Sequence, residues 1–107
     1  MIKAEQIKTK EDIILILDYL KPYNKMIDDL GFEEDTLEYE NACEQIAKYL
    51  WEIDEALVGL QQVNTKNLAD VDIRMMSYWN YLKGKISEKK LFKTLKKYSN
   101  RLLINII

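Results

Sequence analysis

The chain has 107 residues, of which 48% are hydrophobic and 32% are charged, which fits one folded domain and excludes a disordered chain. It contains no histidine and one cysteine, Cys43. Their scarcity excludes catalytic triads built on imidazole, cysteine-rich zinc sites and an internal disulfide framework. What remains is a small protein that works by binding.

The sequence carries no targeting pattern and no membrane-spanning pattern. Its first residues lack the apolar core of a secretory signal peptide. The longest strictly apolar run, residues 13–17, is far shorter than a membrane span. We therefore expect a cytoplasmic protein in a reducing compartment.

The net charge of −2 is the sum of two oppositely charged parts of the chain. Residues 1–72 hold 17 acidic and 7 basic side chains, whereas residues 73–107 hold 1 acidic and 9 basic side chains. This segregation indicates charged partners, or pairing between opposite faces of two copies. The excess of lysine over arginine is typical of an AT-rich genome.

The first predicted helix begins after Thr9, because Thr9 and Asp12 have the spacing of a capping box. Apolar residues then recur at helical spacing as far as Leu20. Pro22 is expected to kink or end this helix, because proline lacks the amide donor and clashes with the preceding turn. A further segment over residues 23–30 should end at Gly31 in a left-handed C-cap.

A long central helix is predicted at about residues 36–62, with Asp35 as its N-cap. Its apolar residues follow alternating steps of four and three, which is a heptad seam. The seam consists of Tyr39, Cys43, Ile46, Leu50, Ile53, Leu57 and Leu60. A helix with so wide an apolar face is either central in a bundle or part of an interface.

The rest of the chain predicts a helical hairpin over residues 68–105. Its first helix should run from about Leu68 to Lys83 and end at Gly84. Its second helix should start at Glu88, capped by Ser87, and continue almost to the end of the chain. The predicted fold is therefore all-α, a single-domain bundle of four to five helices over residues 1–107.

The first candidate site is an acidic face that binds a partner. Its residues share a stretch without lysine or arginine, namely Asp28, Asp29, Glu33, Glu34, Asp35, Glu38, Glu40 and Glu44. The plain alternative is a solvated face. The functional interpretation is a surface that mimics nucleic acid and binds a basic or nucleic-acid-handling protein.

The second candidate site is the basic face of the last helix. Its residues are Lys85, Lys89, Lys93, Lys96, Lys97 and Arg101. Three interpretations stay open: a solvated amphipathic helix, a contact with an acidic protein or a second copy, and phosphate contacts with nucleic acid. The sequence pI of about 5.2 weighs against nucleic acid, and few side chains suited to base reading lie on this helix.

Three aromatic residues are candidate interface anchors: Trp51, Tyr78 and Trp79. Tryptophan and tyrosine are enriched in binding hot spots. We nevertheless expect most of the aromatic and methionine cluster around Tyr78 in the core, together with Cys43, which should pack as a small hydrophobic residue.

No catalytic residue, cofactor site or metal site is predicted. Glu52 and Glu55 could supply one pair of metal-binding carboxylates. A helical metal-dependent hydrolase needs a second pair, and Asp70 and Asp72 would point apart on a helix. The expected protein is therefore not an enzyme.

One part of the chain resembles a known family. Residues 75–102 combine an aromatic helix with the turn Lys83-Gly84-Lys85-Ile86 and the segment Glu88-Lys89-Lys90-Leu91. This part, about a quarter of the chain, is similar to the end of small helical bacteriocin immunity proteins. The resemblance implies a four-helix bundle that protects a producer cell.

The leading hypothesis is a non-enzymatic interaction protein that regulates or inhibits a larger protein partner through the acidic face. Such an inhibitor suits a phage or mobile element. Nucleic-acid binding by the lysine-rich C-terminal helix and an immunity-like bundle are the alternatives. A homo-oligomer is compatible with the first hypothesis, because the acidic face of one copy could meet the basic helix of another.

Overall fold

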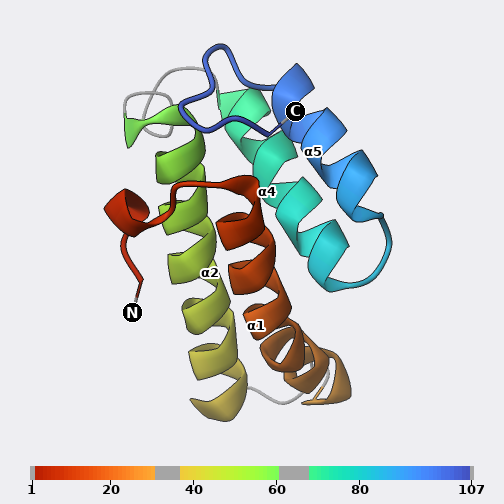
Figure 1. Cartoon of the computed structure of the whole chain (residues 1–107). Helices are drawn as coiled ribbons and strands as arrows, with labels where there is room; N and C mark the ends of the chain where they lie inside the picture. The colour runs from red at the N-terminus through yellow and green to blue at the C-terminus, as the bar shows by residue number, and fades with distance from the viewer. Residues whose placement is uncertain (1, 31–36, 61–67, 107) are drawn as a thin grey trace.

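The computed structural model describes residues 2–30, 37–60 and 68–106. Over these residues the chain forms the short 3-10 helix η1 (Ala4–Gln6) and four α-helices, with no β-strand among them. The α-helices are α1 (Lys10–Leu30), α2 (Leu37–Val58), α4 (Leu68–Leu82) and α5 (Glu88–Lys97). They pack side by side as a bundle (Figure 1). The prediction of an all-α bundle is confirmed.

Helix α2 places its predicted seam in the core. Ile46, Leu50, Ile53 and Leu57 are at most 1% exposed. The helix ends at Val58, before the 62 of the prediction, because Gly59 adopts a φ of 89° that helical residues do not. The last seam residue, Leu60, is consequently exposed. The predicted N-cap, Asp35, lies outside the described residues.

Helix α1 begins as predicted and continues through its proline. The Thr9 hydroxyl accepts a hydrogen bond from the Asp12 amide at 3.1 Å, and the Asp12 carboxylate accepts one from the Thr9 amide at 3.1 Å. Pro22 does not end the helix, which runs to Leu30. Buried residues on both sides of the proline explain this, because tertiary packing outweighs its cost of about 3 kcal/mol. The predicted cap at Gly31 lies outside the described residues.

The turn between α4 and α5 has the predicted chemistry. Gly84 adopts a φ of 73°, and the amides of Gly84 and Lys85 donate to the carbonyls of Tyr81 and Asn80 at 3.0 and 2.9 Å. These two bonds form a Schellman motif. The Ser87 hydroxyl then accepts a hydrogen bond from the Lys90 amide at 3.1 Å, which caps α5. Both predicted caps are confirmed.

The chain after α5 corrects the predicted hairpin. Helix α5 ends at Lys97 rather than near residue 105, and the following residues cross the end of the bundle (Figure 1). The Leu103 amide donates to the Leu57 carbonyl at 2.8 Å, and Ile104 and Ile106 are buried. This segment leaves the helix because its isoleucines cover the bundle's own core.

The N-terminal segment is attached to α2. The Glu52 carboxylate accepts a hydrogen bond from the Ala4 amide at 2.7 Å, and Ile7 is buried in the core. Glu52, considered above as a metal-binding carboxylate, thus holds η1 in place. No helix in the described part of the chain has the length and apolar character needed to cross a bilayer.

Candidate functional site

A buried charged cluster joins α2 to α4 and to the end of α5. The guanidinium of Arg74 donates from Nε and Nη2 to the two carboxylate oxygens of Asp54, at 2.9 and 3.0 Å. Its Nη1 donates to the Tyr98 carbonyl at 2.7 Å, and the Tyr78 hydroxyl donates to Asp54 Oδ1 at 2.8 Å. Asp54, Arg74 and Tyr78 are at most 2% exposed.

This cluster is structural. No substrate can reach it, because all three side chains are closed off from solvent. Burial, together with the neighbouring Asp54 carboxylate, raises the pKa of Tyr78 well above its usual value. The hydroxyl therefore stays protonated and keeps donating its hydrogen bond. The proposal of Tyr78 as an interface anchor is wrong, since its ring is fully buried.

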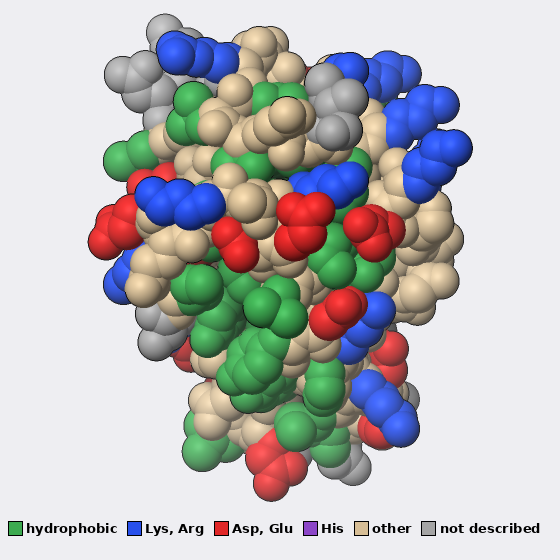
Figure 2. Space-filling view, in the orientation of Figure 1, with side chains coloured by type: hydrophobic (Ala, Val, Ile, Leu, Met, Phe, Trp, Pro, Cys, Tyr) green, Lys and Arg blue, Asp and Glu red, His purple; other side chains and the backbone are tan. Residues whose placement is uncertain are grey.

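The basic residues of α5 surround a groove of about 630 Å³ between α1, α5 and the C-terminal segment. We call it the lysine groove; its lining consists of Lys10, Glu88, Lys89, Phe92, Lys93, Lys96 and Ile106. The ammonium of Lys10 lies 5.8 Å from the centre of the Phe92 ring, within range of a cation–π contact. Figure 2 shows basic side chains gathered along the edge of the molecule over α5.

The lysine groove contains three of the six predicted basic residues. Lys85 lies instead in the exposed turn before α5, and Lys97 places its ammonium 5.4 Å from the ring centre of Tyr98. Lys10 was missed by the sequence analysis, because it comes from the start of α1 and only the packing of α1 near α5 brings it to the groove.

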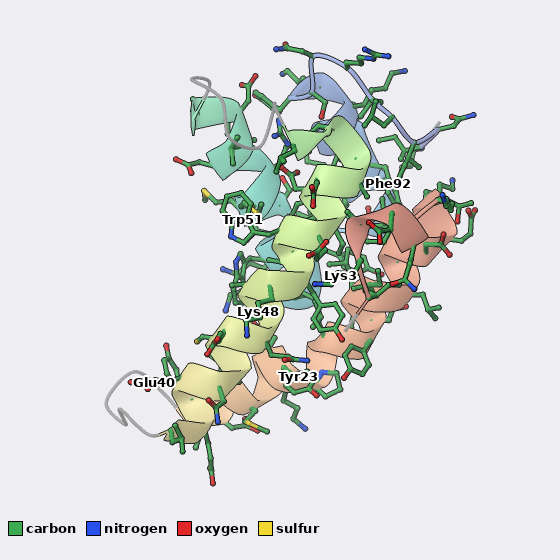
Figure 3. All side chains as sticks on the ribbon, turned by 90° about the vertical axis from the view of Figure 1, so that its left-hand side faces the viewer. Lys3, Tyr23, Glu40, Lys48, Trp51 and Phe92 are labelled. Atoms are coloured by element: carbon green, nitrogen blue, oxygen red, sulfur yellow. The ribbon has the colours of Figure 1, made fainter. Side chains whose placement is uncertain are left out.

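The described residues of the predicted acidic face do not form one surface. Asp28, Asp29, Glu38, Glu40 and Glu44 are exposed, whereas Glu33, Glu34 and Asp35 lie outside the described residues. Asp28 pairs with Lys83 at 3.3 Å, and Glu44 pairs with Lys48 at 2.9 Å. Glu38 lines a groove with Tyr23 on α1, but Tyr23 and Glu40 lie on opposite sides of α2 (Figure 3).

Two tryptophans have different environments. Trp51 is 46% exposed and projects from the same side of α2 as Glu40 (Figure 3). Trp79 is half-buried and packs against the core. Of the three predicted anchors, Trp51 offers the largest accessible surface.

An apolar face on α1 and α2 was not singled out from the sequence. Leu15 and Tyr19 are 72% and 51% exposed, and with Tyr49 they line a shallow groove of about 260 Å³. The ring of Tyr19 lies 5.7 Å from that of Tyr23 and 5.6 Å from that of Tyr49. Figure 2 shows hydrophobic side chains gathered over these helices. Their i, i+4 spacing beside the core stripe is the only sequence signal for this face.

The described residues contain no cluster of three or more potential metal-ligating side chains. Cys43 is half-buried and packs against the core. No family model matches the sequence, and no curated protein or solved structure matches it either. The functional argument therefore rests on the chain's own surface.

Proposed function

We propose that this chain is a non-enzymatic interaction protein that regulates or inhibits a larger protein partner. The observation that carries the proposal is the outer stripe of α2, where the half-exposed Trp51 shares a side of the helix with exposed Glu40. Glu44, one helical turn after Glu40, continues the stripe, but its carboxylate is paired with Lys48 at 2.9 Å, so Glu40 carries the unpaired negative charge among these residues. An exposed aromatic side chain that shares a helix side with a carboxylate three turns away suits a partner that offers an apolar pocket next to a basic surface.

The rigidity of the stripe supports this proposal. Trp51 lies in the middle of a 22-residue helix whose opposite face is fully buried. Its backbone is therefore ordered before binding, so less conformational entropy is lost on association than for a residue in a flexible loop, which favours affinity. The carboxylates on the same helix would speed association with a basic partner and make that association sensitive to salt.

Inhibition is the mode of action that we propose for this partner contact. A small non-enzymatic protein acts on a larger one by occupying its surface. Carboxylates presented on a helix can replace the phosphates of nucleic acid in a basic groove of a nucleic-acid-handling protein. A second copy of this chain is a partner of the same kind, because the lysine groove carries the opposite charge. Such an inhibitor suits a phage or mobile element.

The test is affinity capture from a lysate of the host cell, washed at low and then at high salt, with proteins identified by mass spectrometry. We expect one stoichiometric protein that is released by salt. Trp51→Ala and Glu40→Lys should each reduce its recovery at least about tenfold, as loss of a hot spot does. Glu38→Lys is the matched control, because Glu38 faces the other side of α2. Equal recovery with Trp51→Ala would overturn the proposal.

A further inference from the structure

We propose that the lysine groove is a second interaction site and that it binds an acidic amphipathic helix of a partner protein. The site is separate from the outer stripe of α2, since Phe92 of the groove and Trp51 lie on opposite sides of α2 (Figure 3). The inference therefore goes beyond the function proposed above and does not depend on it.

The spacing of the groove lysines along α5 matches the spacing of residues on one side of a facing helix. Lys89, Lys93 and Lys96 occupy positions i, i+4 and i+7 of α5, so they line one side of the groove over about 10 Å. Two turns of a facing helix cover the same length, and acidic residues at the same period would meet the three ammonium groups. Lys10 from α1 adds a fourth positive charge from the other side.

These positive charges have no ion-pair partner in the part of the chain that the structure describes. Among the described residues, no acidic side chain forms an ion pair with Lys10, Lys89, Lys93 or Lys96. Lys83 and Lys48, by contrast, are both paired. Four ammonium groups outweigh the single Glu88 carboxylate of the lining, so the concave surface has a net positive potential that attracts an anionic partner and raises its association rate.

The lining between the charges distinguishes a helix from nucleic acid. Phe92 and Ile106 lie among the charged residues of the lining, and an aliphatic side chain on the apolar face of a helix needs only their exposed edges and the lysine stems to pack against. Single-stranded nucleic acid instead requires an exposed aromatic face on which bases stack. Phe92 is only 6% exposed, and Lys10 lies over its ring. The groove thus favours an acidic protein segment.

Glu88 makes the two ends of the lysine groove differ in charge. It is the one acidic residue of the lining and lies at the N-terminal end of α5, whereas Lys96 lies two turns further along. An acidic ligand is repelled at the first end and attracted along the rest. Neutralising Glu88 should consequently strengthen binding, which is the opposite of what loss of a lysine should do.

The probe is a synthetic helical peptide of about fifteen residues, with glutamates at i, i+4 and i+7 on one side and leucines beside them. Its binding to the full chain is measured by fluorescence anisotropy at several salt concentrations. We expect Lys93→Glu to weaken binding at least about tenfold and Glu88→Gln to strengthen it. Lys90→Glu is the matched control, since Lys90 is on α5 and outside the groove lining. Circular dichroism establishes that each variant is folded.

Three results would overturn the proposal. The first is no binding of the peptide at low salt. The second is any sign of unspecific attraction, whether it is equal binding of a scrambled peptide of the same composition or an equal loss with Lys90→Glu. The third is tighter binding of a single-stranded oligonucleotide than of the peptide. Trp51→Ala should leave peptide binding unchanged, so failure of this proposal and failure of the α2 stripe are distinguished.

Discussion

The Asp54–Arg74–Tyr78 cluster and the lysine groove place charged side chains in opposite situations. In the cluster, one carboxylate meets one guanidinium and a hydroxyl, and all three are closed off from water. In the groove, four positive charges surround an open concave surface without an ion pair among the described residues. The charged groups of the buried cluster bond to one another within the fold, whereas those of the lysine groove are accessible to a partner.

The difference has a physical cause. Moving an ion out of water costs several kcal/mol, so a buried charge persists only when its hydrogen bonds are complete. Arg74 meets this condition with a two-pronged contact to Asp54 and a third bond to the Tyr98 carbonyl. An exposed lysine keeps its hydration and has no such requirement, so its position reflects function or simple solubility.

The largest effect should follow from breaking the buried pair. Arg74→Met leaves the Asp54 carboxylate buried without its counter-ion and leaves the Tyr98 carbonyl without its donor. We expect a loss of about 3–5 kcal/mol in the free energy of unfolding. Chemical denaturation followed by circular dichroism measures it.

The double variant Asp54→Leu with Arg74→Met tests whether the loss of stability comes from the unpaired Asp54 carboxylate. Replacing both ions by apolar residues removes the unpaired charge, so the double variant should be more stable than Arg74→Met alone. If the two effects instead add, the pair is not coupled as the geometry implies.

A smaller effect is expected from the third member of the cluster. Tyr78→Phe removes one hydrogen bond to a charged acceptor and should cost about 2 kcal/mol. Because the pKa of Tyr78 is raised in the folded state, the unfolded chain loses this proton first as the pH rises. Stability of the parent protein should therefore fall above about pH 10.

The pH profile checks this interpretation. Burial also raises the pKa of Tyr49 and Tyr81. The stability of Tyr78→Phe should therefore still decline as the pH rises above about 10. Its decline should nevertheless be shallower than that of the parent protein. Parallel curves for the two proteins would show that Tyr78 makes no pH-dependent contribution.

Local chemistry explains what the sequence predicted well. Thr9, Gly84 and Ser87 act through neighbours within four residues, so their spacing was sufficient to place helix ends. The end of α5 could not be placed this way, because Ile104 and Ile106 leave the helical path to cover a core built by distant residues. Packing likewise continues α1 past Pro22, so of the two predicted outcomes, a kink or an end of the helix, the end does not occur.

The sites were less predictable than the fold. Asp54 follows the seam residue Ile53, but nothing in the sequence singled it out, because its partner Arg74 is 20 residues away and on another helix. The lysines of α5 were found from composition, whereas Lys10 and Ile106 join them only through tertiary packing. A run of like charges in a sequence indicates a possible site, but which charged residues share a surface depends on the tertiary packing.

The cap of α5 allows a test of how the lysine groove depends on its scaffold. Ser87→Ala removes the acceptor for the Lys90 amide and should cost about 1 kcal/mol. The first turn of α5 carries Lys89 and Glu88, so fraying there would also weaken peptide binding, but less than Lys93→Glu does. Thermal unfolding and the anisotropy assay measure both effects. Unchanged stability would mean that the Ser87 hydroxyl adds nothing beyond hydration.

The smallest effect should come from the exposed counterpart of the buried pair. Asp28 and Lys83 are separated by 3.3 Å, but their side chains are 54% and 32% exposed. Water and salt screen this attraction, so Asp28→Asn should cost less than about 1 kcal/mol and the difference should vanish in high salt. Arg74→Met should remain destabilising under the same conditions, because no salt reaches its partner. The two salt series together measure how far burial, rather than the identity of the charges, determines the strength of an ion pair in this protein.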